Sequence, residues 1–153
     1  MSRVRLVVWH RLAPIVAFAV VAAALAAGRT PDLQTRIGDV EVLSDTQGID
    51  FGPYLAQTLK AVRKSWFTLI PESVDAPVRK KGKVALEFAI KKDGHLTGMR
   101  LDESSGNVVL DRAAWAAISD LKVLPALPAE FKGDYLLLRI RFYYNQPPEG
   151  SAK

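Results

Sequence analysis

The residues of this sequence best suited to nucleophilic chemistry lie between positions 95 and 111. His95, Ser104, Ser105 and Asp111 are the side-chain types that a hydrolase uses as base, nucleophile and orienting acid. A serine nucleophile needs its base within hydrogen-bond reach, and His95 lies at the opposite end of a predicted strand from both serines. We therefore expect no catalytic group here, and Ser104-Ser105-Gly106 is interpreted as a turn that leads into a helix.

Metal-ligating chemistry is also poorly supported. Asp102 and Glu103 are adjacent acidic residues, but neighbouring residues of a strand point to opposite faces of a sheet and do not converge on one ion. The chain contains no cysteine, which excludes thiolate metal sites and disulfide bonds. The sequence thus predicts no metal site, no cofactor and no enzymatic activity.

The positive charge of the chain is concentrated at its N-terminus. The formal net charge is +5, but Arg3, Arg5 and Arg11 precede any acidic residue, and without residues 1–26 the net charge falls to +2. The basic cluster "VRKKGK", residues 78–83, is interpreted as a solvated loop before a strand. Because binding to nucleic acid requires a concentrated basic face, we expect no nucleic-acid partner.

The N-terminal segment is typical of a signal for export. A basic stretch precedes the uncharged segment Leu12–Ala27, and Ala24 and Ala26 form the A-x-A pattern that signal peptidase cleaves. The positive-inside rule places the chain after Gly28 in the periplasm. We expect a signal peptide or N-terminal membrane anchor over residues 1–27, a linker over 28–50 with one short strand near "VEVL", a domain over 51–145 and a flexible tail over 146–153.

The stretch "FAIKKDGHLTGMRL", Phe88–Leu101, predicts a β-hairpin. Asp93-Gly94 readily forms a two-residue type I′ turn, and the resulting register pairs Phe88 with Met99 on an apolar face. The same register pairs Glu87 with Arg100 on the opposite face, where both would meet solvent.

Two amphipathic helices and a final strand accompany the hairpin. Pro53 and Pro71 bound the first helix, whose apolar stripe is Leu55, Leu59, Val62, Trp66 and Ile70. Asn107 caps a second helix, and Trp66 and Trp115 are expected in the core. The strand Tyr135–Tyr144 alternates strictly. We expect an α+β fold with two helices on one face of a three-stranded antiparallel sheet, in the order helix-strand-strand-helix-strand and sheet order 2-1-3.

These elements resemble a known family. "GKVALEFAIKKDGHLTGMRLDESSG", followed by "LDRAAWAAI" and "PALP", is similar to the C-terminal domain of the TonB/TolA superfamily, and the helix "YLAQTLKAVRKSW" looks closer to TolA. The resemblance implies a periplasmic domain that binds envelope proteins and, in its best-known members, passes inner-membrane energy to the outer membrane. The apolar segment here lacks the internal Ser or His of motor-coupled anchors, and the linker of about 20 residues reaches at most about 70 Å.

The last strand is the predicted binding site, because it is long, lacks Pro and Gly and would lie at an open edge. A partner's extended segment would add to this edge, and selectivity would come from Tyr135, Leu137, Arg139, Arg141 and Tyr143. The two arginines favour an acidic partner segment. Further expected partners are the inner membrane, if the N-terminal segment is retained, and a second copy in a strand-exchanged homodimer. The alternative function is a small periplasmic hydrolase or ligand carrier.

Overall fold

A computed structural model of the chain describes residues 36–147, apart from the side chain of Asp39. The predicted signal peptide or membrane anchor, residues 1–27, and most of the predicted tail, residues 146–153, lie outside this range. No helix within residues 36–147 has the length and apolar character needed to cross a membrane.

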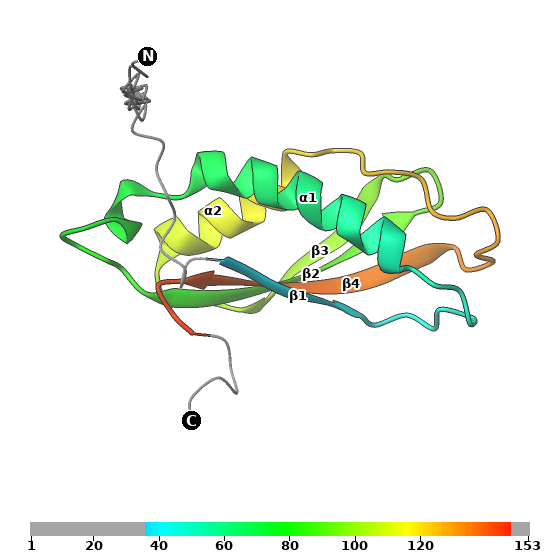
Figure 1. Cartoon of the computed structure of the whole chain (residues 1–153), viewed down its shortest axis with the longest axis horizontal. Helices are drawn as coiled ribbons and strands as arrows, with labels where there is room; N and C mark the ends of the chain where they lie inside the picture. The colour runs from blue at the N-terminus through cyan, green and yellow to red at the C-terminus, as the bar shows by residue number, and fades with distance from the viewer. Residues whose placement is uncertain (1–35, 148–153) are drawn as a thin grey trace, which may run out of the picture.

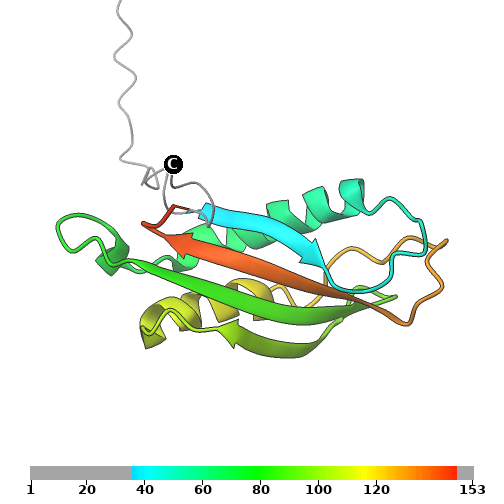
Figure 2. The ribbon, with the colours of Figure 1, turned by 90° about the horizontal axis from the view of Figure 1, so that it is seen from below.

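The described residues form one antiparallel sheet with two α-helices on a single face (Figure 1). In chain order the elements are β1 (Arg36–Val42), α1 (Gly52–Leu69), the 3₁₀ helix η1 (Glu72–Val74), β2 (Gly82–Lys91), β3 (Leu96–Glu103), α2 (Val108–Ser119) and β4 (Tyr135–Tyr144). The sheet order is β1-β4-β2-β3, and Figure 2 shows the four strands from the face that carries no helix. The predicted α+β class, the helices on one face and the order of the last three strands are confirmed.

The sheet has one strand more than the three predicted, and this strand, β1, overlaps the short strand expected near "VEVL". β1 pairs antiparallel with β4, on the side of β4 opposite β2. The strand lies within the predicted linker, residues 28–50, so this part of the linker belongs to the sheet. As a result, β4 is an inner strand of the sheet and not the predicted edge.

The core lies between the helices and the alternating face of the sheet. Phe88 of β2 and the even-numbered residues of β4 from Leu136 to Tyr144 are fully buried, as the alternation predicts. The Trp66 ring packs 5.3 Å from the ring of Phe142 and 5.1 Å from that of Tyr144, measured between centroids. Trp115, which was expected in the core, is instead 38% exposed on α2.

Both helices begin and end close to the predicted positions. Asn107 caps α2 as expected, because its side-chain oxygen accepts a hydrogen bond of 3.0 Å from the backbone N–H of Val109. In the first turns of α1 the buried residues are Tyr54 and Thr58, whereas the predicted Leu55 and Leu59 are only partly buried. The buried stripe of α1 is therefore shifted by one residue at its N-terminal end.

The β2–β3 hairpin has a different turn from the one predicted. The Gly94 N–H donates to the carbonyl of Lys91, and the Lys91 N–H donates to that of His95, so the loop contains three residues. This loop needs a positive φ only at Gly94, where φ is +87°, whereas a type I′ turn would also require one at Asp93. A bulge around Gly98 absorbs the extra residue and restores the predicted pairing of Glu87 with Arg100.

Candidate functional site

The outer edge of β4 is the predicted binding site, and β1 occupies it. The register pairs Arg36 with Tyr143, Ile37 with Phe142, Val40 with Ile140, Glu41 with Arg139 and Val42 with Leu138. Beyond β1, the Leu43 N–H donates to the Leu137 carbonyl and the Ser44 hydroxyl accepts from the Leu137 N–H, each at 2.8 Å. The edge of β4 from Leu137 to Tyr143 is therefore covered by residues 36–44 of the same chain.

The backbone of β4 has a defined orientation toward this edge. Both the N–H and the carbonyl of Leu137 point to the side of β1. The pairing of β4 with β2 is regular over all of β4, so alternate residues keep the same direction along the strand. The backbone groups of Arg139 and Arg141 consequently also face the β1 side.

Carboxylates from three other strands surround the predicted selectivity arginines. Arg139 donates to Glu41 at 3.1 Å, contacts Asp102 at 2.9 Å and donates twice to Glu87. Arg141 contacts Glu41 at 3.3 Å. The expected preference of these arginines for an acidic strand is thus already satisfied within the chain, by Glu41 of β1.

Glu87 lies at the centre of this ion-pair network. The sequence places it at the solvent face, but the side chains around it leave it only 7% exposed, because Arg100 from β3 and Arg139 from β4 close over it. The pKa of Glu87 is lowered, chiefly because Arg100 donates a hydrogen bond to its carboxylate and also because Arg139 does so. Glu87 in turn raises the pKa of Arg139 by accepting its hydrogen bonds.

The remaining predicted site residues differ in how accessible they are. Tyr143 is buried beneath β1, where its ring lies 5.9 Å from the Arg36 guanidinium carbon. A Cβ atom at Gly38 would lie 2.7 Å from Cε2 of Tyr143, so only glycine fits beside this ring without a shift. Leu137 is half-buried, and Tyr135, 53% exposed, lies at the end of β4 beyond the reach of β1.

The residues considered for catalysis form structural contacts instead. The Ser104 and Ser105 hydroxyls both donate to the Asp111 carboxylate, at 2.6 and 2.7 Å. These bonds fix the turn that precedes α2, as the sequence predicts. His95 contacts Asp93 at 3.1 Å beside the hairpin turn and is exposed there. The backbone N–H of His95 lowers the pKa of Asp93 by donating to it.

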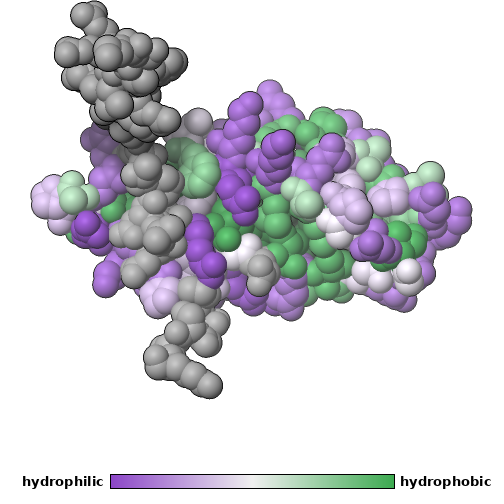
Figure 3. Space-filling view, viewed as in Figure 1, coloured by the Kyte–Doolittle hydropathy of each residue, from purple (hydrophilic) through white to green (hydrophobic). Residues whose placement is uncertain are grey.

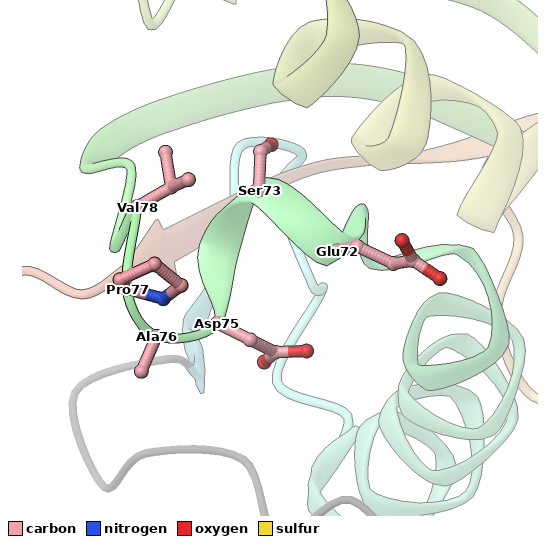
Figure 4. Close-up of a pocket in the computed structure, with 6 residues that line it drawn as sticks. All are labelled: Glu72, Ser73, Asp75, Ala76, Pro77 and Val78. Atoms are coloured by element: carbon pink, nitrogen blue, oxygen red, sulfur yellow. The ribbon is translucent and has the colours of Figure 1, made fainter.

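Two surface depressions among the described residues were considered as candidate ligand sites. One, of about 700 Å³, is lined by Glu72, Ser73 and residues 75–78, and Figure 4 shows that all of them belong to one short segment between α1 and β2. A second, of about 430 Å³, lies beside the hairpin turn and Tyr135. Within residues 36–147 no group of three His, Asp or Glu side chains could hold a metal ion. The first depression is formed by a single segment, and the second is lined by Lys91, Lys92, Asp93, Thr97, Asp134 and Tyr135.

Residues 71–145 match the family described as the Gram-negative bacterial TonB protein C-terminal. This part of the chain is a TonB C-terminal domain. The match contains β2, β3, α2 and β4, whereas β1 and α1 precede it. A TonB C-terminal domain is noncatalytic, so the prediction that the chain is not an enzyme is confirmed by the family.

Two individual proteins are also similar to the chain. Protein TonB of Haemophilus influenzae is 41% identical over 54 residues, which is 35% of this chain and 20% of that protein. The chain therefore matches about a fifth of the length of this curated relative. The NMR structure of the Helicobacter pylori TonB C-terminal domain is 20% identical, with a TM-score of 0.43, and the alignment covers 66% of this chain and 98% of the H. pylori chain.

Proposed function

We propose that this chain is an exported, noncatalytic protein-binding domain of the cell envelope. In this proposal an extended segment of an envelope protein adds as a strand at the outer edge of β4, and main-chain hydrogen bonds supply the affinity. The TonB C-terminal family supports a location in the periplasm and a role in transport across the envelope. If residues 1–27 stay attached, the inner membrane is a further partner and coupling to its energy becomes feasible.

The observation that carries this proposal is the pairing of β1 with the outer edge of β4. The edge accepts an antiparallel strand and offers it backbone groups from Leu137, Arg139 and Arg141. It also offers two cations and an aromatic ring on the sheet face that no helix covers. An edge that binds one extended segment in this way has the properties that strand addition requires.

A proline in β4 tests the proposal. Arg141→Pro removes one backbone donor that faces the outer edge and leaves the groups that face β2 in place. We expect this variant to lose capture of envelope proteins, measured by cross-linking of the full chain in an envelope extract of its host and mass spectrometry of the linked peptides. Arg141→Gln is the matched control, because it removes the same side chain and keeps the N–H, so we expect it to lose only the charge contribution of Arg141 and to keep more capture than Arg141→Pro.

Circular dichroism establishes that both variants are folded before capture is compared. If folded Arg141→Pro captures the same cross-linked segments as Arg141→Gln, strand addition at β4 is the wrong mechanism. The surface of α1 that carries the exposed residues Lys60 and Lys64 would then be the next site to test.

A further inference from the structure

β1 is attached to the domain by few buried side chains. It pairs with a single strand, and a bulge between Ile37 and Val40 interrupts its register. Among its apolar side chains only Ile37 is buried, while Val40 and Val42 are partly buried. In the space-filling view of this side, hydrophobic side chains are visible along the seam between α1 and β1 (Figure 3). By contrast, Leu136, Leu138 and Ile140 of β4 are fully buried against the helices.

The rest of the fold has anchors of its own. Phe51, 3% exposed, packs its ring 5.3 Å from that of Phe131 and opens α1. From Phe51 onward, both helices and the strands β4 and β2 share the buried core that includes Trp66 and Phe88, and Leu96 and Met99 of β3 pack against it while partly buried. The region that matches the TonB C-terminal family begins at residue 71 and does not include β1. Departure of β1 would leave the three-stranded, two-helix fold that the sequence predicts, with the β4 edge open.

The contacts of β1 also describe the kind of strand that this edge accepts. Glu41 places a carboxylate against Arg139 and Arg141, at 3.1 and 3.3 Å. Gly38 leaves room for the Tyr143 ring. Ile37 and Val42 supply apolar side chains on the helix-covered face, where their partners Phe142 and Leu138 lie.

We propose that β1 is an exchangeable strand. It covers the outer edge of β4, from Leu137 to Tyr143, and a partner segment binds to that edge by replacing β1. The segment that competes best carries an acidic residue opposite Arg139 and Arg141, a small residue beside Tyr143 and apolar residues at alternating positions. This inference rests on the proposed capture at β4, and it adds that capture is an exchange reaction with a defined internal competitor.

A synthetic peptide with the sequence of residues 36–44, RIGDVEVLS, is the probe for this exchange. In the unmodified chain β1 competes with the labelled peptide. Gly38→Val drives a side chain against Tyr143 and releases β1, so we expect the peptide to bind this variant at least about tenfold more tightly, because the competent form becomes more populated. A peptide with Lys in place of Glu41 should bind neither form. Equal affinity of RIGDVEVLS for both chains overturns the proposal.

Matched variants separate β1 release from a general loss of stability. Glu41→Lys should increase peptide binding, because it places a cation against Arg139 and Arg141. Glu103→Lys is the control on the opposite edge strand, where Glu103 is similarly exposed and pairs with Lys83, and it should leave peptide binding unchanged. An increase of the same size in Glu103→Lys would overturn the proposal.

A disulfide that locks β1 in place provides the converse test. Val42 and Leu138 are opposite each other in the register, at the Cα separation that a disulfide can bridge. In Val42→Cys/Leu138→Cys we expect the oxidised chain to bind no peptide and the reduced chain to bind it, which makes the protein its own control. Peptide binding to the oxidised chain overturns the exchange. Loss of envelope capture in Arg141→Pro is measured separately, so exchange and capture can fail independently.

Discussion

Replacing Glu87 with alanine tests whether the helix-free face of the sheet contributes to stability. The side chain of Glu87 is 9% exposed and accepts hydrogen bonds from Arg100 and Arg139, which lie on the two strands flanking β2. Glu87→Ala removes the carboxylate that joins three strands. The two arginines then lose their shared partner while the apolar core on the other face is unchanged.

The expected loss of unfolding free energy in Glu87→Ala depends on how exposed the two remaining arginines are. Removing one member of a buried ion pair costs about 3–5 kcal/mol, and a hydrogen bond to a charged group contributes about 1.5–3 kcal/mol. The Arg139 side chain is 22% exposed and that of Arg100 is 62% exposed, and both keep contact with Asp102. Because water and Asp102 compensate part of the loss, we expect Glu87→Ala to lower the free energy of unfolding by about 2–3 kcal/mol.

Glu103→Ala is the control for this measurement. Glu103 also forms an ion pair on the sheet, 2.9 Å from Lys83, but its side chain is 45% exposed. Its loss should cost less than about 1 kcal/mol, because exposed ion pairs contribute little. Urea denaturation of the parent protein, Glu87→Ala and Glu103→Ala at pH 7 measures both losses of unfolding free energy.

The pH dependence provides a second check on the same residue. Because folding lowers the pKa of Glu87, the unfolded chain binds the proton more readily, and the stabilisation is complete above the ordinary pKa of about 4.5. It is lost as the pH falls through the lower pKa of the folded state. The stability gap between the parent and Glu87→Ala should therefore shrink below about pH 4.5. Two results would refute the reasoning. One is a loss of unfolding free energy in Glu87→Ala at pH 7 that is no larger than the loss in Glu103→Ala, and the other is a loss that stays the same in acid.

Two further substitutions address the core. Phe88→Ala should lower the free energy of unfolding by about 3–5 kcal/mol, measured by urea denaturation, because loss of the fully buried ring leaves a cavity in the core. Tyr144→Phe should cost about 1–3 kcal/mol in the same assay, because it removes the hydroxyl that accepts from the Trp66 indole N–H at 2.8 Å and donates to the Leu110 carbonyl at 3.0 Å, and so leaves the buried indole N–H unpaired. A loss under about 0.5 kcal/mol in either variant would contradict the described packing.

Features encoded by local patterns were predictable from the sequence. The alternation of β4 identifies its buried residues, and Asn107 marks the start of α2. The Asp93-Gly94 pair locates the hairpin, but a three-residue loop with a compensating bulge keeps the same outer register, so the turn type was not predictable. The shift of the buried stripe to Tyr54 and Thr58 depends on how α1 lies across the sheet, which periodicity does not specify.

Features that depend on distant pairing were missed. The segment RIGDVEV contains Gly and Asp, which are uncommon in strands, and its pairing partner lies at the opposite end of the domain. Without β1, the sequence assigns β4 to an edge and leaves Arg139 and Arg141 free for a partner. Likewise, the burial of Glu87 arises from arginines on two neighbouring strands, and alternation within β2 alone indicates only which face it occupies.

The position of β1 at the start of the described fold also has a mechanical consequence. Residues 28–35 separate the predicted membrane segment from Arg36 and span at most about 28 Å when fully extended. If β1 also left the sheet, the tether would run over residues 28–50 to Phe51 and reach roughly three times as far.

Among the described residues, tension arriving along the chain from its N-terminal side first reaches the pair of Arg36 with Tyr143. A pull directed away from the sheet loads the pairs of β1 one after another, beginning at Arg36, so the strand unzips under a lower force than simultaneous rupture of all its pairs would need. Such a pull would lengthen the tether and uncover the β4 edge in a single event. The reach of the domain and the state of its edge would then be set by the same force.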